Sequence, residues 1–144
     1  MVRSGSQRGA GHINTADAYS VAVGESYIKA RSLMPAQVLR LALPTKPVLT
    51  AEEFKTLDSR VKAYFKLTAQ ALALAWVTPY AVECNSITSA LTLGFDASMC
   101  SPGCQRARPS PYFNASTARP FTDLKLRPSM LLAAADAAGA QALI

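Results

Sequence analysis

The sequence predicts a mainly α-helical protein with a long central helix, a second helix, a Pro-rich irregular arm and a short C-terminal helix. Three observations predict this class. Alanine dominates the hydrophobic residues, which are 50% of the 144-residue chain, and alanine favours closely packed helices. A well-marked helix start stands at Thr50. Five of the nine prolines fall within residues 96–128, which excludes an ordinary helix there.

The N-terminal part divides into a flexible basic tail, residues 1–13, and a helical region, residues 14–95. The tail is rich in Gly, Ser and Arg and contains the single histidine, His12. Within residues 14–32 the apolar side chains fit one helical face, although their alternation also fits a short strand. We favour the helix. Residues 38–43 lie between prolines and fit either a helical turn or an edge strand.

The central helix is predicted over residues 50–77. Thr50 and Glu53 have the spacing of a capping box, in which each side chain binds the other residue's amide. Leu49 and Phe54 occupy the positions of a hydrophobic staple across this cap. An apolar stripe at three- and four-residue spacing follows, formed by Phe54, Leu57, Val61, Tyr64, Phe65 and Thr68.

An uncharged segment continues the pattern, since Glu83 carries the only formal charge between Leu67 and Phe95. A second helix is predicted over residues 79–93, with Thr78 as cap, Pro79 in the first position and Gly94 as the stop. The uncharged run is shorter than the ~20 residues that span a bilayer. Residues 67–93 together are long enough, which makes membrane contact an alternative for this segment.

The Pro-rich extended arm, residues 96–128, is predicted to be disordered or to lie along a partner's surface. A C-terminal helix, residues 129–144, follows with Ser129 as its cap. Its apolar end indicates docking. The predicted partner-binding residues are the aromatic and basic side chains of the arm and this apolar end: Arg106, Arg108, Tyr112, Phe113, Arg119, Phe121, Leu143 and Ile144.

No motif for catalysis, nucleotide binding or a cofactor is present, so we predict neither an enzyme nor a cofactor site. His12 lies in the predicted tail, where it is not held as a general base must be. The three cysteines leave alternatives open. Cys100 and Cys104 fit free thiols, a small disulfide, or a zinc site with Cys84 as third ligand and no evident fourth.

The net charge of +6 is concentrated in two basic arms around a nearly uncharged centre. Such arms suit phosphate, an anionic membrane surface or an acidic protein partner. We therefore expect a non-enzymatic structural or accessory subunit of a larger multiprotein assembly, bound to other protein subunits. The alternative is a nucleic-acid-associated coat or ribosomal-type protein. No secretory signal peptide is recognisable, and the compartment stays unassigned between an organelle and a membrane complex.

Overall fold

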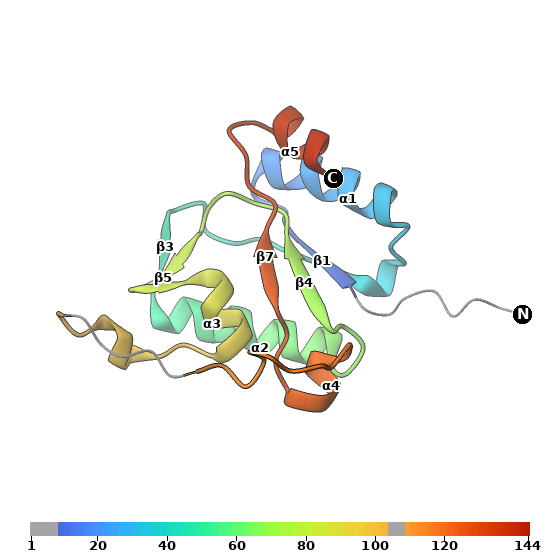
Figure 1. Ribbon diagram of the computed structural model, residues 1–144. Coiled ribbons are helices and arrows are strands. Elements are labelled where there is room, and N and C mark those ends of the chain that lie inside the picture. Colours follow the sequence, from blue (N-terminus) through green and yellow to red (C-terminus); the bar gives the residue numbers. More distant parts are fainter. Residues whose placement is uncertain (1–8, 104–108) are drawn as a thin grey trace, which may run out of the picture.

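A computed structural model describes residues 9–103 and 109–144, and it is built around a parallel four-stranded sheet in the order β2-β1-β4-β7. The strands are β1 (Gly9–Asn14), β2 (Val38–Leu41), β4 (Ala71–Leu74) and β7 (Ser129–Leu131). Helices α1 (Ala18–Arg31) and α5 (Ala137–Leu143) cover one face, and α2 (Ala51–Phe65) and α3 (Ile87–Leu93) cover the other (Figure 1). The fold is α/β, and the predicted mainly α fold is wrong.

Strand β1 lies at the centre of the sheet, between β2 and β4. Residues 9–13, predicted as part of the tail, belong to this strand, and residues 1–8 lie outside the described part. Tyr27 of α1 packs over this strand, because a Cβ at Gly11 would lie in ordinary contact with Tyr27 Cδ1 at 3.7 Å. The helix predicted within residues 14–32 is confirmed as α1, although its cap is Asp17.

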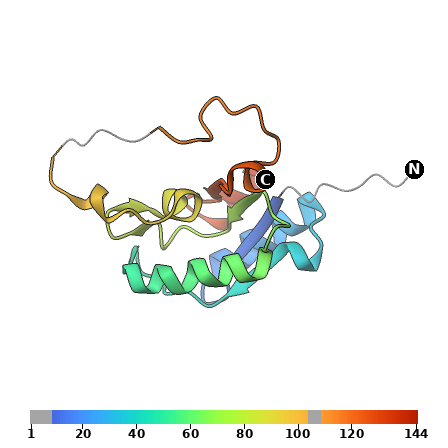
Figure 2. The same cartoon turned by 90° about the horizontal axis from the view of Figure 1, so that it is seen from below.

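The start of α2 is confirmed in detail. Both hydrogen bonds of the Thr50–Glu53 capping box form, and Phe54, Leu57, Val61 and Phe65 are buried along one face. The helix does not continue to residue 77. It ends at Phe65, and Lys66 follows with a φ of 45°, which an α-helix does not allow. The chain then turns back into the sheet as β4 (Figure 2).

Strand β4 explains why the central segment carries no charge. It pairs with β1 and β7, and helices cover both its faces, so Leu72, Ala73 and Leu74 are buried and Ala71 is partly buried. Leu72, Leu74 and Trp76 belong to the larger core on the α2 side. Ala75, on the opposite face, belongs to the smaller core under α1. A strand buried on both faces produces the apolar run that we interpreted as helix.

The predicted second helix is replaced by a small sheet and a short helix. Strands β3 (Val48–Leu49), β5 (Ala81–Val82) and β6 (Asn85–Ser86) pair in the order β3-β5-β6. Helix α3 begins only after Ser86, its cap, and ends at Gly94 as predicted. Pro79 lies in the irregular stretch between β4 and β5 and opens no helix, and its peptide bond with Thr78 is cis.

Membrane contact through residues 67–93 is not supported, and this prediction is corrected. Within residues 9–103 and 109–144 no helix is long and apolar enough to cross a bilayer. Trp76, which lies within this segment, is fully buried and donates from Nε1 to the Pro79 carbonyl at 2.9 Å. Glu83 is exposed and accepts at 3.1 Å from the Ala51 amide, at the positive end of the α2 dipole.

The remaining elements are short. The 3₁₀ helix η1 (Pro35–Gln37) precedes β2, and β2 confirms the edge-strand alternative for residues 38–43. The 3₁₀ helix η2 (Ala97–Cys100) follows α3, and α4 (Pro120–Leu124) precedes β7. Residues 129–144 form β7 and α5 rather than one helix, because the cap is Asp136 and not Ser129.

Candidate interaction surface

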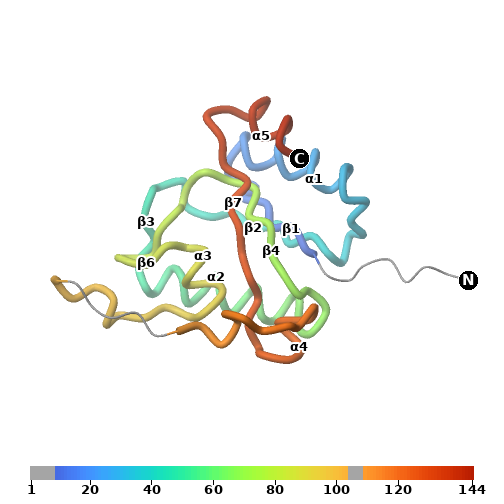
Figure 3. Tube along the Cα trace, in the orientation of Figure 1, coloured from blue at the N-terminus to red at the C-terminus, as the bar shows by residue number. Residues whose placement is uncertain are grey.

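The segment between α3 and α4 is the part of the described chain that stands away from the two cores. We call residues 97–116 the outer arm; the structure describes residues 97–103 and 109–116 of it. None of these described residues is buried. Figure 2 shows both described ends of the outer arm curving away from the body, and Figure 3 shows the chain leaving near β6 and returning at α4.

At its first end the outer arm is held by a disulfide between Cys84 and Cys100. Cys84 lies in the turn between β5 and β6, and Cys100 is the last residue of η2. Next to the disulfide, the Asn85 side chain donates to the Asp96 carbonyl at 3.1 Å and accepts from its amide at 3.2 Å. The chain entering the arm is therefore fixed to the small sheet.

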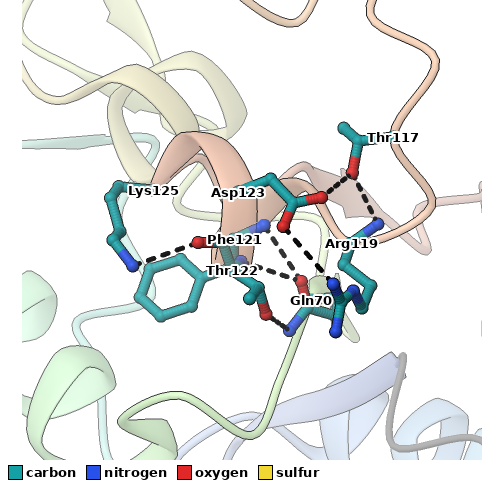
Figure 4. Close-up of polar contacts among 7 residues, drawn as sticks. All are labelled: Gln70, Thr117, Arg119, Phe121, Thr122, Asp123 and Lys125. Carbon is teal, nitrogen blue, oxygen red and sulfur yellow. Dashed lines mark hydrogen bonds and ion pairs between the residues drawn. The ribbon is translucent and has the colours of Figure 1, made fainter.

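At its second end the arm is held through α4 by Gln70 (Figure 4). The buried Gln70 side chain accepts from the Phe121 and Thr122 amides at 3.0 and 3.1 Å, and donates to the Thr122 hydroxyl at 2.9 Å. These amides lie in the first turn of α4, where backbone donors lack helical partners. Gln70 thus caps α4 from just before β4.

Arg127 completes this second attachment from inside the protein. It is 4% exposed, and its guanidinium donates to the carbonyls of Ala69 at 2.8 Å and Lys66 at 2.7 Å. The guanidinium carbon lies 3.7 Å from the centroid of the Phe121 ring, a close cation–π contact. Desolvation lowers the pKa of Arg127, but arginine keeps its charge in proteins.

The structure separates the predicted partner-binding residues into three groups. Tyr112 and Phe113 are exposed at 41% and 76%, on the outer arm. Arg119 is exposed but lies 3.7 Å from Asp123, while Phe121 is half-buried against Arg127. Arg106 and Arg108 lie outside the described residues.

The apolar C-terminal end is remote from the arm, because α5 packs beside α1 on the other face of the sheet (Figure 1). Leu143 is 80% exposed, whereas Ile144 packs against the smaller core. The predicted residues therefore do not form one surface. Sequence reasoning also missed Met99, which is 52% exposed on η2, and the two attachments through Cys84 and Gln70. The signal available in the sequence was a methionine within the Pro-rich segment.

His12 is not in a mobile tail but fully buried in β1, at right angles to the Trp76 ring with centroids 4.8 Å apart. Neither ring nitrogen has a hydrogen-bond partner among residues 9–103 and 109–144. Burial lowers the pKa of His12 from 6.5 to about 3, so the ring is neutral at ordinary pH. Without access to solvent, His12 is not placed to exchange a proton with a substrate.

The zinc alternative finds no support in the described part of the chain, where no three metal-ligating side chains come together. Cys84 and Cys100 are bonded to each other, and Cys104 lies outside the described residues.

A hollow of about 430 Å³ lies between residues 41–44 and α2. Its one carboxylate, Glu53, already binds Lys46 at 2.8 Å and the Thr50 amide. The pKa of Glu53 is lowered first of all by the Lys46 hydrogen bond. Of the other polar residues that line this hollow, Thr56 donates to the Glu52 carbonyl at 3.3 Å, and Arg60 adds one cation.

The fold and its surface define an α/β protein with a parallel sheet covered on both faces and a doubly attached peripheral arm. No protein-family model, no curated protein and no solved structure matches this chain.

Proposed function

We propose that this protein is a non-enzymatic accessory subunit of a multiprotein assembly and that it contacts its partner through the outer arm. One observation carries this proposal. The outer arm exposes Met99, Tyr112 and Phe113, although both its ends are fixed to the body. These side chains gain nothing from the protein's own core, whereas burial against another surface would stabilise each by ~1.5–3 kcal/mol.

The attachments of the arm favour binding. An unattached loop loses conformational freedom when it binds, which costs about 0.5–1.5 kcal/mol for each immobilised side chain, and partial ordering of the free loop reduces that cost. Cys100 and Gln70 restrict the arm before any partner arrives. Tyrosine and methionine are enriched at interfaces, and aromatic residues dominate the residues that matter most for affinity.

The partner that fits this surface is a protein with an apolar pocket and acidic surroundings. Phe113 and Tyr112 would enter the pocket, and the sequence supplies Arg106 and Arg108 between them and Cys100. Opposite charge around an apolar contact speeds association and selects the partner.

A nucleic acid is the second candidate partner, and the observation that favours it is the net charge of +6. Several of the basic side chains already have acidic partners: Arg40 binds Glu25 at 2.6 Å and Lys62 binds Asp58 at 2.5 Å. Arg127 is buried. Fewer cations are then left for phosphates than the sequence suggests, and we favour the protein partner.

The test is the native size of the protein in extracts of the cells that make it. Wild type should elute far above its own mass of 15.3 kDa. The double variant Y112S/F113S should elute near that mass with an unchanged melting temperature, because both side chains are exposed. As a matched control, V21S/L67S removes two exposed apolar side chains from other surfaces and should elute like wild type.

Two results would contradict the proposal: elution of wild type as a single chain, or an assembly that keeps Y112S/F113S. Collapse of the large species on nuclease treatment, together with steep salt dependence, would instead support the nucleic-acid candidate.

A further inference from the structure

We propose that the Cys84–Cys100 disulfide is a thiol-exchange site, which a dithiol reductant opens to release the outer arm without unfolding the body. The effect on partner binding rests on the function proposed above; the exchange itself does not. The proposal is built on three features: the exposure of both cysteines, the local character of the hydrogen bonds in residues 97–103 and 109–116, and the independent support of the sheets.

Both cysteines are exposed. Cys84 lies in a two-residue turn together with Glu83, and Cys100 is followed by the exposed Ser101. Thiol–disulfide exchange requires a thiolate to approach one sulfur from outside, so access sets the rate together with thiol pKa. Exposed disulfides are the labile class, whereas structural disulfides resist reduction.

The disulfide is also the main attachment of the first part of the outer arm. Among residues 97–103 and 109–116, the hydrogen bonds described are local, such as Met99 to Asp96 and Tyr112 to Ser110. In these ranges only the disulfide joins the outer arm directly to the small sheet. Next to the bond, the Asn85–Asp96 hydrogen bonds join the start of η2 to the small sheet, and they do not involve the disulfide.

The body does not depend on the disulfide in the same way. Val82, Ile87 and Ala90 hold β5 and α3 in the larger core. Backbone bonds add to this support, since the Glu83 amide donates to the Leu49 carbonyl at 3.0 Å and the Ile87 amide to Tyr80 at 2.8 Å. Reduction should therefore change the arm and leave the sheets and helices folded.

The chemistry balances with a dithiol as the two-electron donor. Its thiolate attacks one sulfur, Cys84 or Cys100, which forms a mixed disulfide and expels the other cysteine as a thiolate that takes up a proton. The second thiol of the donor then attacks the mixed disulfide. The protein is left with two thiols, and the donor is oxidised to a disulfide.

The first experiment needs no partner. Purified full-length protein is treated with increasing dithiothreitol, free thiols are alkylated, and the disulfide is mapped by mass spectrometry while amide hydrogen exchange is followed. We expect reduction of Cys84–Cys100 with several-fold faster exchange at Asp96, Met99 and Ser101. Leu72, in β4, should stay protected, because exchange there requires opening of the sheet.

Two variants sharpen this test. C84S/C100S should show the fast exchange with and without reductant, and C104S should behave like wild type. The proposal is overturned if the bond is reduced only when Leu72 also loses protection, if reduction leaves Asp96, Met99 and Ser101 unchanged, or if Cys100 is found bonded to Cys104.

The same variants in the assembly experiment separate the two proposals. Release of the arm should weaken the assembly roughly tenfold, since the arm must then be ordered on binding. If Y112S/F113S disrupts the assembly but C84S/C100S does not, the arm binds the partner and the control by thiol exchange is wrong. If reduction frees the arm but Y112S/F113S stays assembled, the exchange site is real and the proposed function fails.

Discussion

Arg127 and Phe121 lie against each other, with the guanidinium carbon 3.7 Å from the ring centroid, where the chain returns from the outer arm to the sheet. The contact joins a buried cation to the helix that ends the arm. Phe121, predicted to bind a partner, therefore makes a contact inside the protein, and the cation that it contacts is almost fully buried.

Replacing Arg127 by methionine should destabilise the protein by about 2–4 kcal/mol, because the buried carbonyl of Ala69 and the part-buried carbonyl of Lys66 would lose their donor. Urea denaturation measures the change. R119A is the control, since Arg119 forms only an exposed ion pair and its loss should cost less than about 1 kcal/mol. Equal midpoints for R127M and wild type would show that the buried guanidinium does not hold this region.

His12 should make stability depend on pH. Its folded pKa of about 3 lies below the ordinary value of 6.5, so the unfolded chain binds a proton that the folded chain does not. The contribution of His12 to the free energy of unfolding is complete above pH 6.5. It is lost as pH falls toward 3, by about 1.4 kcal/mol for each pH unit.

The variant H12F lacks this proton and should lose less stability than wild type between pH 6.5 and 4.5. The free energy of unfolding of both proteins is measured by urea denaturation across this range. The pH-dependent contribution of the carboxylates cancels in the difference, because both proteins contain the same carboxylates. Parallel pH curves for H12F and wild type would exclude a buried neutral His12.

Removing the Cys84–Cys100 disulfide should lower stability by about 3 kcal/mol, as expected for a closed loop whose ends are 16 residues apart. Thermal unfolding of C84S/C100S measures this. The transition should stay cooperative because the sheets persist. Unchanged melting of the double variant would mean that the bond does not restrict the unfolded chain, and C104S should melt like wild type.

Gly24 is where α1 lies against β1, since a Cβ there would lie 2.5 Å from Ile13 Cδ1. G24A should therefore destabilise the protein by about 1–3 kcal/mol, although alanine favours a helix over glycine. In a double-mutant cycle, G24A should be far less harmful in an I13A background, where the clashing atoms are absent. Additive effects of G24A and I13A would place the clash elsewhere.

The α2 helix could be predicted because its signals are local. A cap at Thr50, its reciprocal partner Glu53 and a periodic apolar face act within a few residues, and the helix forms where these signals begin. Its end could not be predicted in the same way. Nothing near Phe65 in the sequence marks a stop as strongly as Thr50 marks a start.

Strands β1 and β4 were missed for different reasons. In β4 and the two residues after it, the large side chains Leu72, Leu74 and Trp76 alternate with alanines, and this period of two was the available signal. Its apolar run is equally compatible with a buried helix. Strand β1 contains Gly9, Gly11 and His12, which are typical of loops. It is a strand because its neighbours β2 and β4, distant in sequence, pair with it.

The candidate surface could be predicted only in part. Tyr112 and Phe113 could be predicted because they are aromatic residues in a Pro-rich segment, and the structure shows that both are exposed. The inward orientation of Phe121 depends on Arg127 and Gln70, and the pairing of Cys84 with Cys100 depends on the place of η2 beside the small sheet. Such long-range relationships leave no local pattern in one sequence.

The double attachment of the arm also means that this molecule can serve as a scaffold for displaying loops. Cys100 and Gln70 fix the two ends, and no described residue of the outer arm belongs to either core. The chain between the ends can therefore be exchanged for an unrelated binding sequence. Doubling its length would cost only about 0.6 kcal/mol in loop closure, so foreign inserts of varied size are compatible with the same sheet.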